Sequence, residues 1–525
     1  MNSRQNKILY RRNRMKFIKA ISLLLLLFCI ACSQGIEIRK INGDLIDSNE
    51  VDKTVVGLMD SANVTGLCLA ILKENDVAYM RTYGFRNKEK NEWLDENTVM
   101  RGASLSKAVF AYIVMQLVQK NMLDLDKPLF TYLDKPLPEY DDYQDLIADH
   151  RWKLVTARIC LNHTTGFPNL RFINPRRNGK LEFFFTPGSR YAYSGEGIKL
   201  LQFVVEQITD KGLDDLADEM VFKPLGMDRT SYVWKDIFED NFAVGHDIIE
   251  SVIDYKRMTE PSGSGSLLTS ISDYSKFVEA IMEGRGLEKE IWLTMLSPSI
   301  RINSKQQFPT LLNETTDKYD SIELSYGLGW GIFKCRYGKA FFKEGHGQGW
   351  QNYNVNFIDQ KTSLIIMTNS DNGEKIFKEL LEKIIGDTFT PWEWEGYIPY
   401  DKIEPKSIGV YLYDIIILEN VDEAIEKYKK IKKSPLKKNF IFNEDELNSL
   451  GYEMINSEKI DNAIKIFKLN IDEYPNSSSA YEGLGDAYQK RGQIDLAIEN
   501  YEKSVELDPD NDSAKRALKK LKNNK

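Results

Sequence analysis

The sequence is poor in the residues that build metal sites and disulfide frameworks. It has 4 histidines and 5 cysteines among 525 residues, and the histidines show neither an HExxH pattern nor a paired spacing. Because zinc sites need such clustered ligands, we expect no metal and no cofactor. Beyond residue 32 the cysteines are too scattered for a disulfide framework. We interpret them as small core residues: Cys68, Cys160 and Cys335.

The chain also lacks a strong net charge of either sign. Its net charge is -8, and no long basic stripe follows the N-terminus. The sequence therefore gives no reason to expect nucleic acid as a partner. Apolar residues make up 42% of the chain, as in ordinary folded proteins. A chain of 525 residues is too long for a single core, so we expect two or three domains.

The first 32 residues have the layout of an export signal. Basic residues between Arg11 and Lys19 precede an almost unbroken apolar run from Ile21 to Ile30, and small residues with Cys32 follow. The run is too short to span a bilayer comfortably. Its end is similar to that of a bacterial lipoprotein signal, in which Cys32 would carry the lipid. We predict an exported, membrane-anchored lipoprotein that faces the periplasm or the cell exterior, with an uncleaved N-terminal anchor as the alternative.

Changes in composition along the sequence divide the chain into four segments. Residues 1–32 are the signal segment, residues 33–50 are a polar tether, residues 51–390 are the main domain and residues 400–525 are charged amphipathic helices. The main domain opens with a predicted hairpin around residues 73–76, continues as helix and loop, and returns to strands between Leu328 and Thr368. This order favours an α+β fold, in which one antiparallel sheet is closed by its own termini and carries a helical insertion.

The C-terminal segment repeats itself with a period of 34 residues. Small residues where two helices cross, and a proline after the second helix, are typical of the tetratricopeptide repeat (TPR) at this period. We predict an all-α domain with clear repeats at about residues 446–479 and 480–513, preceded by a degenerate copy that contains Asp422–Tyr428. The sequence leaves open whether these helices bind a protein partner or cap the main domain. The matched pairs are Gly451 and Gly485, Ala463 and Ala497, Phe467 and Tyr501, and Pro475 and Pro509.

Ser104 and Lys107 form the candidate catalytic pair. They are three residues apart, so on a helix they lie on one face, one turn apart. A neutral Lys107 amine could take the proton of Ser104 as its oxygen attacks a carbonyl. Residues 109–118 keep an apolar period near 3.6, which predicts a buried helix with Ser104 at or near its N-terminus. The spacing alone is a weak signal, because Ser434 and Lys437 share it in a polar connector.

Two further segments fall where a serine acyl-transfer enzyme needs them: Pro187–Gly195, which contains Tyr193, and Gly345–Gly349, which contains His346. With Ser104 and Lys107 in place, the chain resembles the serine β-lactamase and penicillin-binding family, in its class C and DD-peptidase branch. The resemblance covers about residues 50–385. Its further landmarks, in family order, are Leu161–Pro168, Leu225–Met227, Gly263–Leu268 before Ser272–Asp273, and Tyr326–Trp330.

The resemblance implies a role for each matched residue. Ser104 would be the acylated nucleophile and Lys107 its base or proton relay. Tyr193 would pass the proton to the leaving group, with a pKa lowered by adjacent ammonium charge. His346 would replace the lysine of the third motif, help hold the substrate and tune Tyr193. The backbone N–H groups of Ser104 and Gly349 would form the oxyanion hole.

Two positions depart from the family pattern, and with Gly347 they are the candidate substrate-binding residues. Gly195 stands where the family has an asparagine whose amide contacts the substrate. Gln348 stands at the third position of His-x-Gly, where a small residue lets substrate lie along the strand. Both departures affect specificity more than the nucleophile. We interpret His163 and His246 as structural residues and Glu196 as a solvated carboxylate.

The sequence therefore predicts an exported serine hydrolase that cleaves an amide or ester bond through an acyl-Ser104 intermediate. Its substrate would be a small peptide, an ester or a β-lactam, as for a β-lactamase, a D-Ala-D-Ala carboxypeptidase, an esterase or a peptidase. Gly195 and Gln348 make a dedicated β-lactamase the less favoured of these. The alternative is a non-catalytic binding protein that uses the hydrolase fold and the TPR helices to bind a partner, against which the intact candidate catalytic residues argue.

Overall fold

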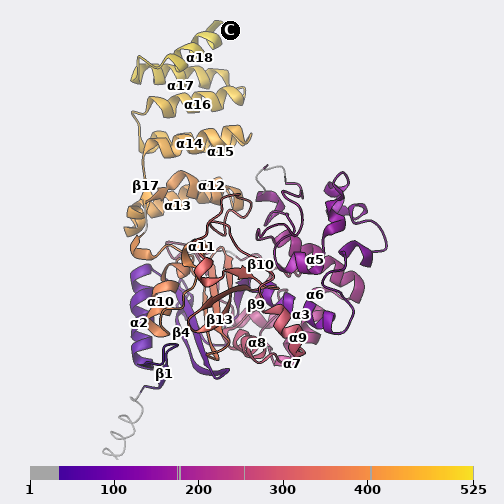
Figure 1. The fold of residues 1–525 in the computed structure, drawn as a ribbon. Coiled ribbons are helices and arrows are strands. Elements are labelled where there is room, and N and C mark those ends of the chain that lie inside the picture. The colour runs from indigo at the N-terminus through magenta and orange to yellow at the C-terminus, as the bar shows by residue number, and fades with distance from the viewer. Residues whose placement is uncertain (1–34, 174–175, 177–178, 254, 403–404, 524–525) are drawn as a thin grey trace, which may run out of the picture. The chain divides into compact units, whose positions relative to one another are not determined.

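The computed structural model describes residues 35–523, except 174–175, 177–178, 254 and 403–404. The described chain forms two compact units, one that ends at Tyr400 and one that begins at Asp401 (Figure 1). The predicted signal segment, residues 1–32, and its candidate lipidation site Cys32 lie outside the described residues. Among the helices that are described, none is both long enough and apolar enough to cross a bilayer.

The first unit is built on one antiparallel sheet, as predicted. The strands from the two ends of the unit meet in its middle, where Leu364 pairs with Ile71. The unit therefore has the predicted α+β fold, with a sheet closed by its own termini. In spatial order the strands are β10 (Ile300–Arg301), β11 (Ser325–Tyr326), β12 (Gly331–Cys335), β13 (Gly338–Gly347), β14 (Trp350–Phe357), β15 (Thr362–Thr368), β3 (Gly66–Lys73), β4 (Asp76–Asn87) and β5 (Glu92–Trp93).

Tight turns set the register of this sheet. The hairpin of β3 and β4 turns at Glu74 and Asn75, which both have positive φ, 52° and 68°. Two residues, Arg336 and Tyr337, join β12 to β13. The strand predicted to begin at Leu328 begins at Gly331 instead, because the chain still bends through Gly329, whose φ is +89°.

Helices cover both faces of the sheet (Figure 1). The odd-numbered residues of β3 from Leu67 to Ile71 pack in one core with α2 (Ser48–Ala62) and α10 (Phe377–Ile384). The even-numbered residues from Cys68 to Leu72 pack in a second core with α3 (Ser106–Gln119) and α8 (Ile271–Glu283). Since alternate side chains of a strand point to opposite faces, one apolar strand serves both layers.

The segment between α3 and α8 is the predicted insertion, but it is not all-helical, because loops and turns make up most of it and short strands also occur. The pair β6–β9 joins the residues just before Ser104 to the segment just before α8. Short 3₁₀ turns, and one π-helical turn at Asp218–Phe222, connect the other elements. Before α3 lies β6 (Met100–Ala103). Between α3 and α8 lie α4 (Ala157–Leu161), α5 (Gly195–Thr209), α6 (Leu213–Ala217), α7 (Lys223–Leu225), β7 (Gly245–His246), β8 (Val252–Ile253) and β9 (Leu267–Thr269), and after α8 come α9 (Lys289–Met295) and α11 (Trp392–Glu395).

The segment predicted as a tether, residues 33–50, is folded where the structure describes it. β1 (Glu37–Arg39) pairs with β2 (Leu45–Asp47), and α2 begins at Ser48. Ile38, Ile41 and Ile46 are buried, at 2%, 5% and 3% exposure. The tether prediction is wrong here because a few well-spaced isoleucines bury an otherwise polar segment.

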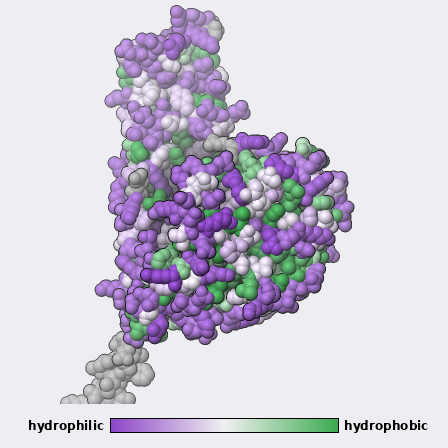
Figure 2. Space-filling view, in the orientation of Figure 1, coloured by the Kyte–Doolittle hydropathy of each residue, from purple (hydrophilic) through white to green (hydrophobic). Residues whose placement is uncertain are grey.

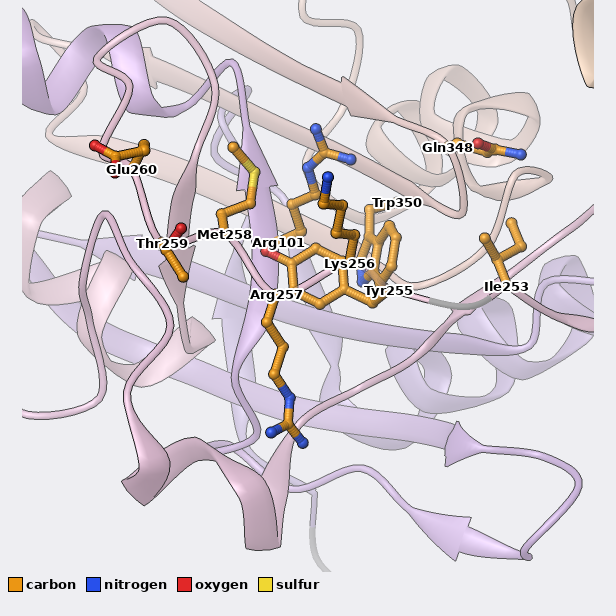
Figure 3. Close-up of a pocket in the computed structure, with 10 residues that line it drawn as sticks. All are labelled: Arg101, Ile253, Tyr255, Lys256, Arg257, Met258, Thr259, Glu260, Gln348 and Trp350. Atoms are coloured by element: carbon orange, nitrogen blue, oxygen red, sulfur yellow. The ribbon is translucent and has the colours of Figure 1, made fainter. Parts of the chain in front are cut away.

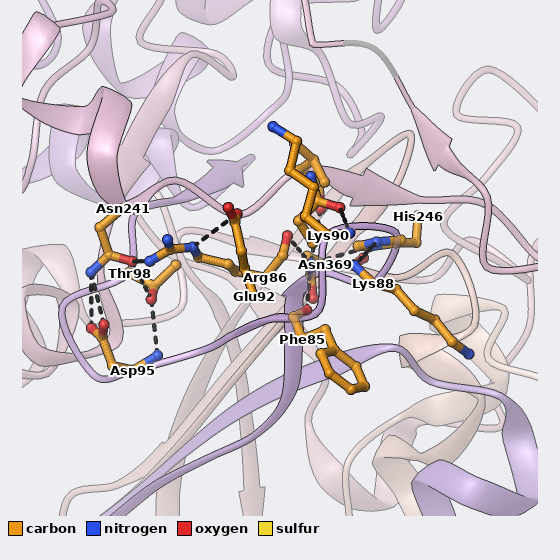
Figure 4. A network of polar contacts seen from close by, with 12 residues as sticks. Phe85, Arg86, Lys88, Lys90, Glu92, Asp95, Thr98, Asn241, His246 and Asn369 are labelled. Atoms are coloured by element: carbon orange, nitrogen blue, oxygen red, sulfur yellow. Dashed lines mark hydrogen bonds and ion pairs between the residues drawn. The ribbon is translucent and has the colours of Figure 1, made fainter.

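A buried amide fixes the end of β4 to the end of β15 (Figure 4). Asn369 donates through Nδ2 to the carbonyl oxygens of Phe85 at 3.1 Å and Arg86 at 3.2 Å. His246 belongs to the same network, because its Nε2 accepts the backbone N–H of Lys88 at 3.2 Å. The interpretation of His246 as a structural residue is confirmed.

The second unit consists of consecutive helix pairs, and close packing explains its period. A Cβ added at Gly451 would lie 2.5 Å from Phe467 Cζ, and one at Gly485 would lie 2.8 Å from Tyr501 Cε1. Each repeat therefore needs glycine where its two helices cross. The visible face of these helices is largely hydrophilic (Figure 2). The helices are α12 (Ile408–Leu418), α13 (Val421–Lys433), α14 (Glu444–Asn456), α15 (Ile460–Glu473), α16 (Ser478–Lys490), α17 (Ile494–Leu507) and α18 (Asp512–Asn523), with the short strands β16 (Lys406–Ser407) and β17 (Phe440–Ile441).

Candidate active site

Ser104 stands on a sharp turn between β6 and α3, two residues before the helix begins. Ala103 has a φ of +48°, a left-handed conformation that residues with a side chain seldom adopt. Such strain persists only where the surroundings fix it. Here Ser106 does so, because its Oγ donates to the Ala103 carbonyl at 2.5 Å and accepts the Leu267 N–H at 2.9 Å. The turn holds Ser104 beside the N-terminus of α3, as predicted.

Lys107 lies within hydrogen-bond distance of the candidate nucleophile. Its Nζ is 3.0 Å from Ser104 Oγ. The side chain is buried, and its Nζ also donates to the Ser264 carbonyl at 2.5 Å. Burial, reinforced by the Lys343 ammonium, holds the pKa of Lys107 well below its usual range. Lys107 is therefore suited to act as a neutral amine, which is the form that can accept a proton.

Tyr193 completes the group around Ser104. Its ring lies under Lys107 Nζ, 4.8 Å from the ring centroid, and its Oη is 3.2 Å from Lys343 Nζ. Burial raises the pKa of Tyr193, although Lys343 and a hydrogen bond with Ser104 act in the opposite direction. The expectation of a lowered pKa is therefore wrong, because burial outweighs the nearby ammonium, and Tyr193 is a neutral phenol.

Lys343 and Glu344 are site residues that the sequence reasoning missed. Lys343 is fully buried on β13, and its Nζ lies 3.0 Å from Glu344 Oε1. Burial opposes both charges, but their mutual attraction outweighs it, so the pKa of Lys343 is raised and that of Glu344 is lowered. The signal was present in the sequence, because Lys343-Glu344-Gly345 is itself a Lys-x-Gly element three residues before His346.

The structure places His346 on the other face of β13. The strand pairs with β14 without a bulge, so two residues three positions apart, such as Lys343 and His346, point to opposite faces. His346 Nε2 lies 3.2 Å from Tyr397 Oη and 3.3 Å from Glu374 Oε2. This placement contradicts the role predicted for the His346 side chain, since Lys343 occupies the position beside Tyr193.

One edge of β13 is free next to Ser104. The last pair between β12 and β13 joins Gly331 to Phe342, so in the described chain residues 343–347 have no partner strand on that side. Alternate residues of an antiparallel strand present both backbone groups to the same side, and those that face β12 are Gly338, Ala340 and Phe342. By this alternation the backbone groups of Glu344 and His346 face the free edge.

The turn after β13 does not supply the predicted oxyanion donor. Gln348 and Gly349 form the two-residue turn between β13 and β14. The Gly349 N–H donates to Asp371 Oδ1 at 2.6 Å, so this N–H is already engaged, which contradicts its assignment to the oxyanion hole. Gly347 lies against Arg101, whose Cζ would be 3.3 Å from a Cβ added at Gly347. Gln348 lines a cavity with Arg101 (Figure 3).

Gly195 is the first residue of α5, and its backbone packing leaves no room for the asparagine of the family pattern. Its N–H donates to Asn169, with the backbone oxygen and Oδ1 both at 3.0 Å. A Cβ added at Gly195 would lie 2.8 Å from the Asn169 backbone oxygen. The local backbone therefore requires glycine at position 195, because Asn169 occupies the space that a side chain there would need.

Two polar residues near Tyr193 are buried. Glu196 is only 2% exposed and pairs with Arg171 at 2.9 Å, so its interpretation as a solvated carboxylate is wrong. His163 packs 4.2 Å from the Tyr193 ring and accepts the Ser194 N–H through Nδ1. Burial and the two site lysines hold the pKa of His163 well below its usual range, so it is a neutral support for Tyr193.

Comparison with known proteins identifies the family of the first unit and the repeats of the second. The family model described as Beta-lactamase matches residues 51–385, which is most of the first unit. The chain belongs to the beta-lactamase family. A Tetratricopeptide repeat model matches residues 478–511 of the same chain. The resemblance drawn from the sequence, with its C-terminal TPR helices, is confirmed.

Relatives of this beta-lactamase-family chain are named for several different activities. Penicillin-binding protein 4* of Bacillus subtilis (strain 168) is 23% identical over 340 residues, which cover 58% of this chain and 68% of the relative. A D-aminopeptidase of Brucella anthropi is 22% identical, and the match covers 62% of this chain and 60% of the relative. The esterase EstB of Burkholderia gladioli is 28% identical over 32% of this chain and 47% of its own length. The chain thus spans only part of the length of these relatives.

Two solved structures share the fold of the beta-lactamase-family unit. The octameric penicillin-binding protein homologue from Pyrococcus abyssi gives a TM-score of 0.52 at 22% identity, with 67% of this chain and 80% of that chain covered. D-alanine carboxypeptidase AmpC from Burkholderia cenocepacia gives a TM-score of 0.50 at 15% identity, with 62% and 95% covered. At these identities the likeness concerns the fold alone.

Proposed function

We propose that this beta-lactamase-family protein is a serine hydrolase that cleaves an amide or ester bond through an acyl-Ser104 intermediate. The observation that carries the proposal is the 3.0 Å separation between Lys107 Nζ and Ser104 Oγ. It is supported by the low pKa of Lys107, which makes the amine a proton acceptor rather than a second ammonium. The alternative of a non-catalytic binding protein is not favoured, because this arrangement has no use in a scaffold.

The proposed reaction uses each group in the ionisation state that its surroundings favour. Lys107 accepts the Ser104 proton as Oγ bonds to the substrate carbonyl carbon. The backbone N–H groups of Ser104 and His346, the latter on the free edge of β13, stabilise the oxyanion. The neutral phenol of Tyr193, held by Lys343, relays the proton from Lys107 to the departing amine or alcohol. Water then attacks the acyl carbonyl and gives a proton to Lys107. As the bond between the acyl carbon and Ser104 Oγ breaks, Lys107 returns this proton to Oγ, which releases the acid and restores the Ser104 hydroxyl and the neutral amine.

The proposed substrates follow the names of the relatives: a small peptide, an ester or a β-lactam. Gly195 has no side chain to contact a substrate amide, which favours a peptidase or esterase over a dedicated β-lactamase. We further propose export and lipidation at Cys32, with the hydrolase unit in the periplasm or at the cell exterior. The TPR helices would then present a surface to a protein partner.

The proposal is tested by measuring the intact mass of the protein after its reaction with reagents that acylate or phosphonylate a serine. The protein is exposed separately to a penicillin and to a broad serine-reactive phosphonate, and we expect an adduct with the phosphonate that disappears in Ser104→Ala. Ser61→Ala, which removes a serine on the outer helix α2, is the matched control and should label like the wild type. Labelling by the phosphonate but not by the penicillin would indicate a peptidase or an esterase. An adduct that persists in Ser104→Ala, or no adduct with either reagent, would refute the proposed function.

A further inference from the structure

Residues 303–316 form a hairpin in the segment that connects β10 to β11. Lys305 and Glu314 join its two sides, through a backbone hydrogen bond of 3.0 Å and an ion pair of 2.7 Å. We call this hairpin the finger, and residues 306–313 at its end the fingertip. The finger closes on itself, so the position of the fingertip depends on what holds it from outside.

One side of the fingertip is fixed to the buried pair Lys343–Glu344. Gln307 is buried, and its Nε2 donates to Glu344 Oε1 at 2.9 Å. The Gln307 N–H donates to the Trp394 carbonyl at 2.8 Å, so this residue is held at its backbone as well as at its side chain. The fingertip therefore has a fixed position relative to the groups around Ser104.

The other side of the fingertip is held by Arg190, which precedes Tyr193 by three residues. The Arg190 guanidinium donates to the carbonyl oxygens of Leu312 at 3.0 Å and Leu311 at 3.3 Å. Because Arg190 and Tyr193 belong to one loop, the fingertip and the assigned proton relay are fixed to the same backbone. Support of this kind is needed where a side chain must meet a substrate at one position.

Phe308 is the fingertip residue that contacts Tyr193 and still lies open to solvent. Its ring lies edge-on to the Tyr193 ring, with the two centroids 5.6 Å apart. Tyr193 is buried, whereas Phe308 is 40% exposed, and the same fingertip carries Leu312, which is 42% exposed. Tyr193 in turn shares a hydrogen bond with Ser104, so a single ring separates Phe308 from the candidate nucleophile. The fingertip thus presents open apolar surface beside the site.

We propose that Phe308 binds an apolar part of the leaving group. The inference rests on the proposed function, in which Tyr193 gives the proton to the leaving group and must therefore lie within hydrogen-bond distance of it. The preferred substrates are then amides or esters whose departing amine or alcohol carries an aromatic or branched aliphatic group. Burial of such a group against the ring is favourable, by about fourfold for each methylene group removed from water. Phe308 thus determines specificity and takes no part in bond making.

Two phosphonates that share one phosphonyl group and differ in the leaving group test this inference in the full-length protein. One releases para-isopropylphenol and the other para-(hydroxymethyl)phenol, which are similar in size and acidity. In both reactions Ser104 Oγ bonds to phosphorus, and the Ser104 proton departs with the phenol. Each rate is divided by the hydrolysis rate of the same reagent in buffer, which corrects for intrinsic reactivity. We expect the wild type to label roughly 5- to 20-fold faster with the isopropyl reagent.

Variants of Phe308 show whether the fingertip causes this preference. Phe308→Ala should reduce the ratio of the two corrected rates to about twofold or less, and Phe308→Leu, which keeps an apolar side chain, should retain part of it. The ratio is decisive because loss of packing on Tyr193 would slow both reagents alike, whereas loss of an apolar contact slows only one. Trp93→Ala removes an exposed aromatic ring on β5, at the opposite edge of the sheet from β10. It is the matched control and should leave the ratio unchanged.

The outcomes distinguish this inference from the proposed function. Equal corrected rates for wild-type Ser104 would overturn the role of the fingertip and leave the acyl-serine proposal standing. A preference that survives in Phe308→Ala, or one that Trp93→Ala also removes, would overturn the role of Phe308. If neither reagent labels wild-type Ser104, both proposals fail. If Phe308→Ala does not fold, as circular dichroism would show, the wild-type comparison and Phe308→Leu still decide the case.

Discussion

Lys343, rather than His346, should control the reactivity of Ser104. We consider Lys343→Met, which keeps the length of the side chain and removes its charge, and His346→Ala, which keeps the backbone N–H. Lys343 Nζ donates to Tyr193 Oη at 3.2 Å, whereas His346 faces Tyr397 on the other side of the strand. Only the first change touches the group that contacts Ser104.

The expected magnitudes follow from the environments of the two residues. A hydrogen bond from a charged donor is worth about 1.5–3 kcal/mol, so Lys343→Met should slow phosphonate labelling of Ser104 by roughly 10- to 150-fold. The side chains of His346 and Glu374 are 29% and 33% exposed. A partly exposed pair of this kind is worth about 0–1 kcal/mol, so even if its whole loss reached the site, His346→Ala would slow labelling by no more than about fivefold.

A double variant separates loss of chemistry from loss of folding. Lys343→Met leaves the buried Glu344 carboxylate unpaired, which costs about 3–5 kcal/mol of stability. Lys343→Met combined with Glu344→Gln removes both charges and should recover much of that stability in thermal unfolding, while labelling stays slow. If the double variant recovers the labelling rate, or if His346→Ala is as slow as Lys343→Met, the reasoning is refuted.

Two further predictions concern pH and the repeats. Lys107 must be neutral to accept a proton, and its pKa is lowered, so the labelling rate should rise with pH through that lowered pKa and stay level above it. The midpoint of this rise should lie well below the pKa of an ordinary lysine. A midpoint at the ordinary lysine value would contradict this prediction. Gly485→Ala should destabilise the TPR unit by about 1–3 kcal/mol in thermal unfolding, because its Cβ would lie 2.8 Å from Tyr501. Gly57→Ala, in α2 with nothing within 4 Å, should instead stabilise the protein by roughly 0.5–1 kcal/mol, and equal effects would refute the packing argument.

The fold was predictable because its signals are local. The β-rich apolar runs around Lys73–Asp76, the 34-residue period and the apolar run after Ser104 each indicate a single element and its immediate packing. The tether at residues 33–50 was mispredicted for the opposite reason. Ile38 and Ile46 look like isolated residues in a polar stretch, and only the pairing of β1 with β2 buries them together.

The candidate site was predictable where its residues share one element and not where they come from two. Ser104 and Lys107 are one helical turn apart, so their spacing carries their geometry. Whether Lys343 or His346 lies beside Tyr193 depends on which face of β13 packs against Tyr193, and the local sequence does not reveal that face. Gly349 was assigned a free N–H because its partner Asp371 lies beyond the next two strands and cannot be seen from the motif.

The Lys343–Glu344 pair also decides which of the two site lysines is neutral. Lys343 has a carboxylate at 3.0 Å and keeps its proton, whereas Lys107 has a hydroxyl and a carbonyl as neighbours. The Lys343 ammonium lowers the pKa of Lys107 more than Glu344 raises it. Removing both charges should therefore raise the pKa of Lys107, and the pH midpoint of labelling should move upward in the double variant. A midpoint that stays or moves down would mean that burial alone keeps Lys107 neutral, and the pair would then serve only to hold Tyr193.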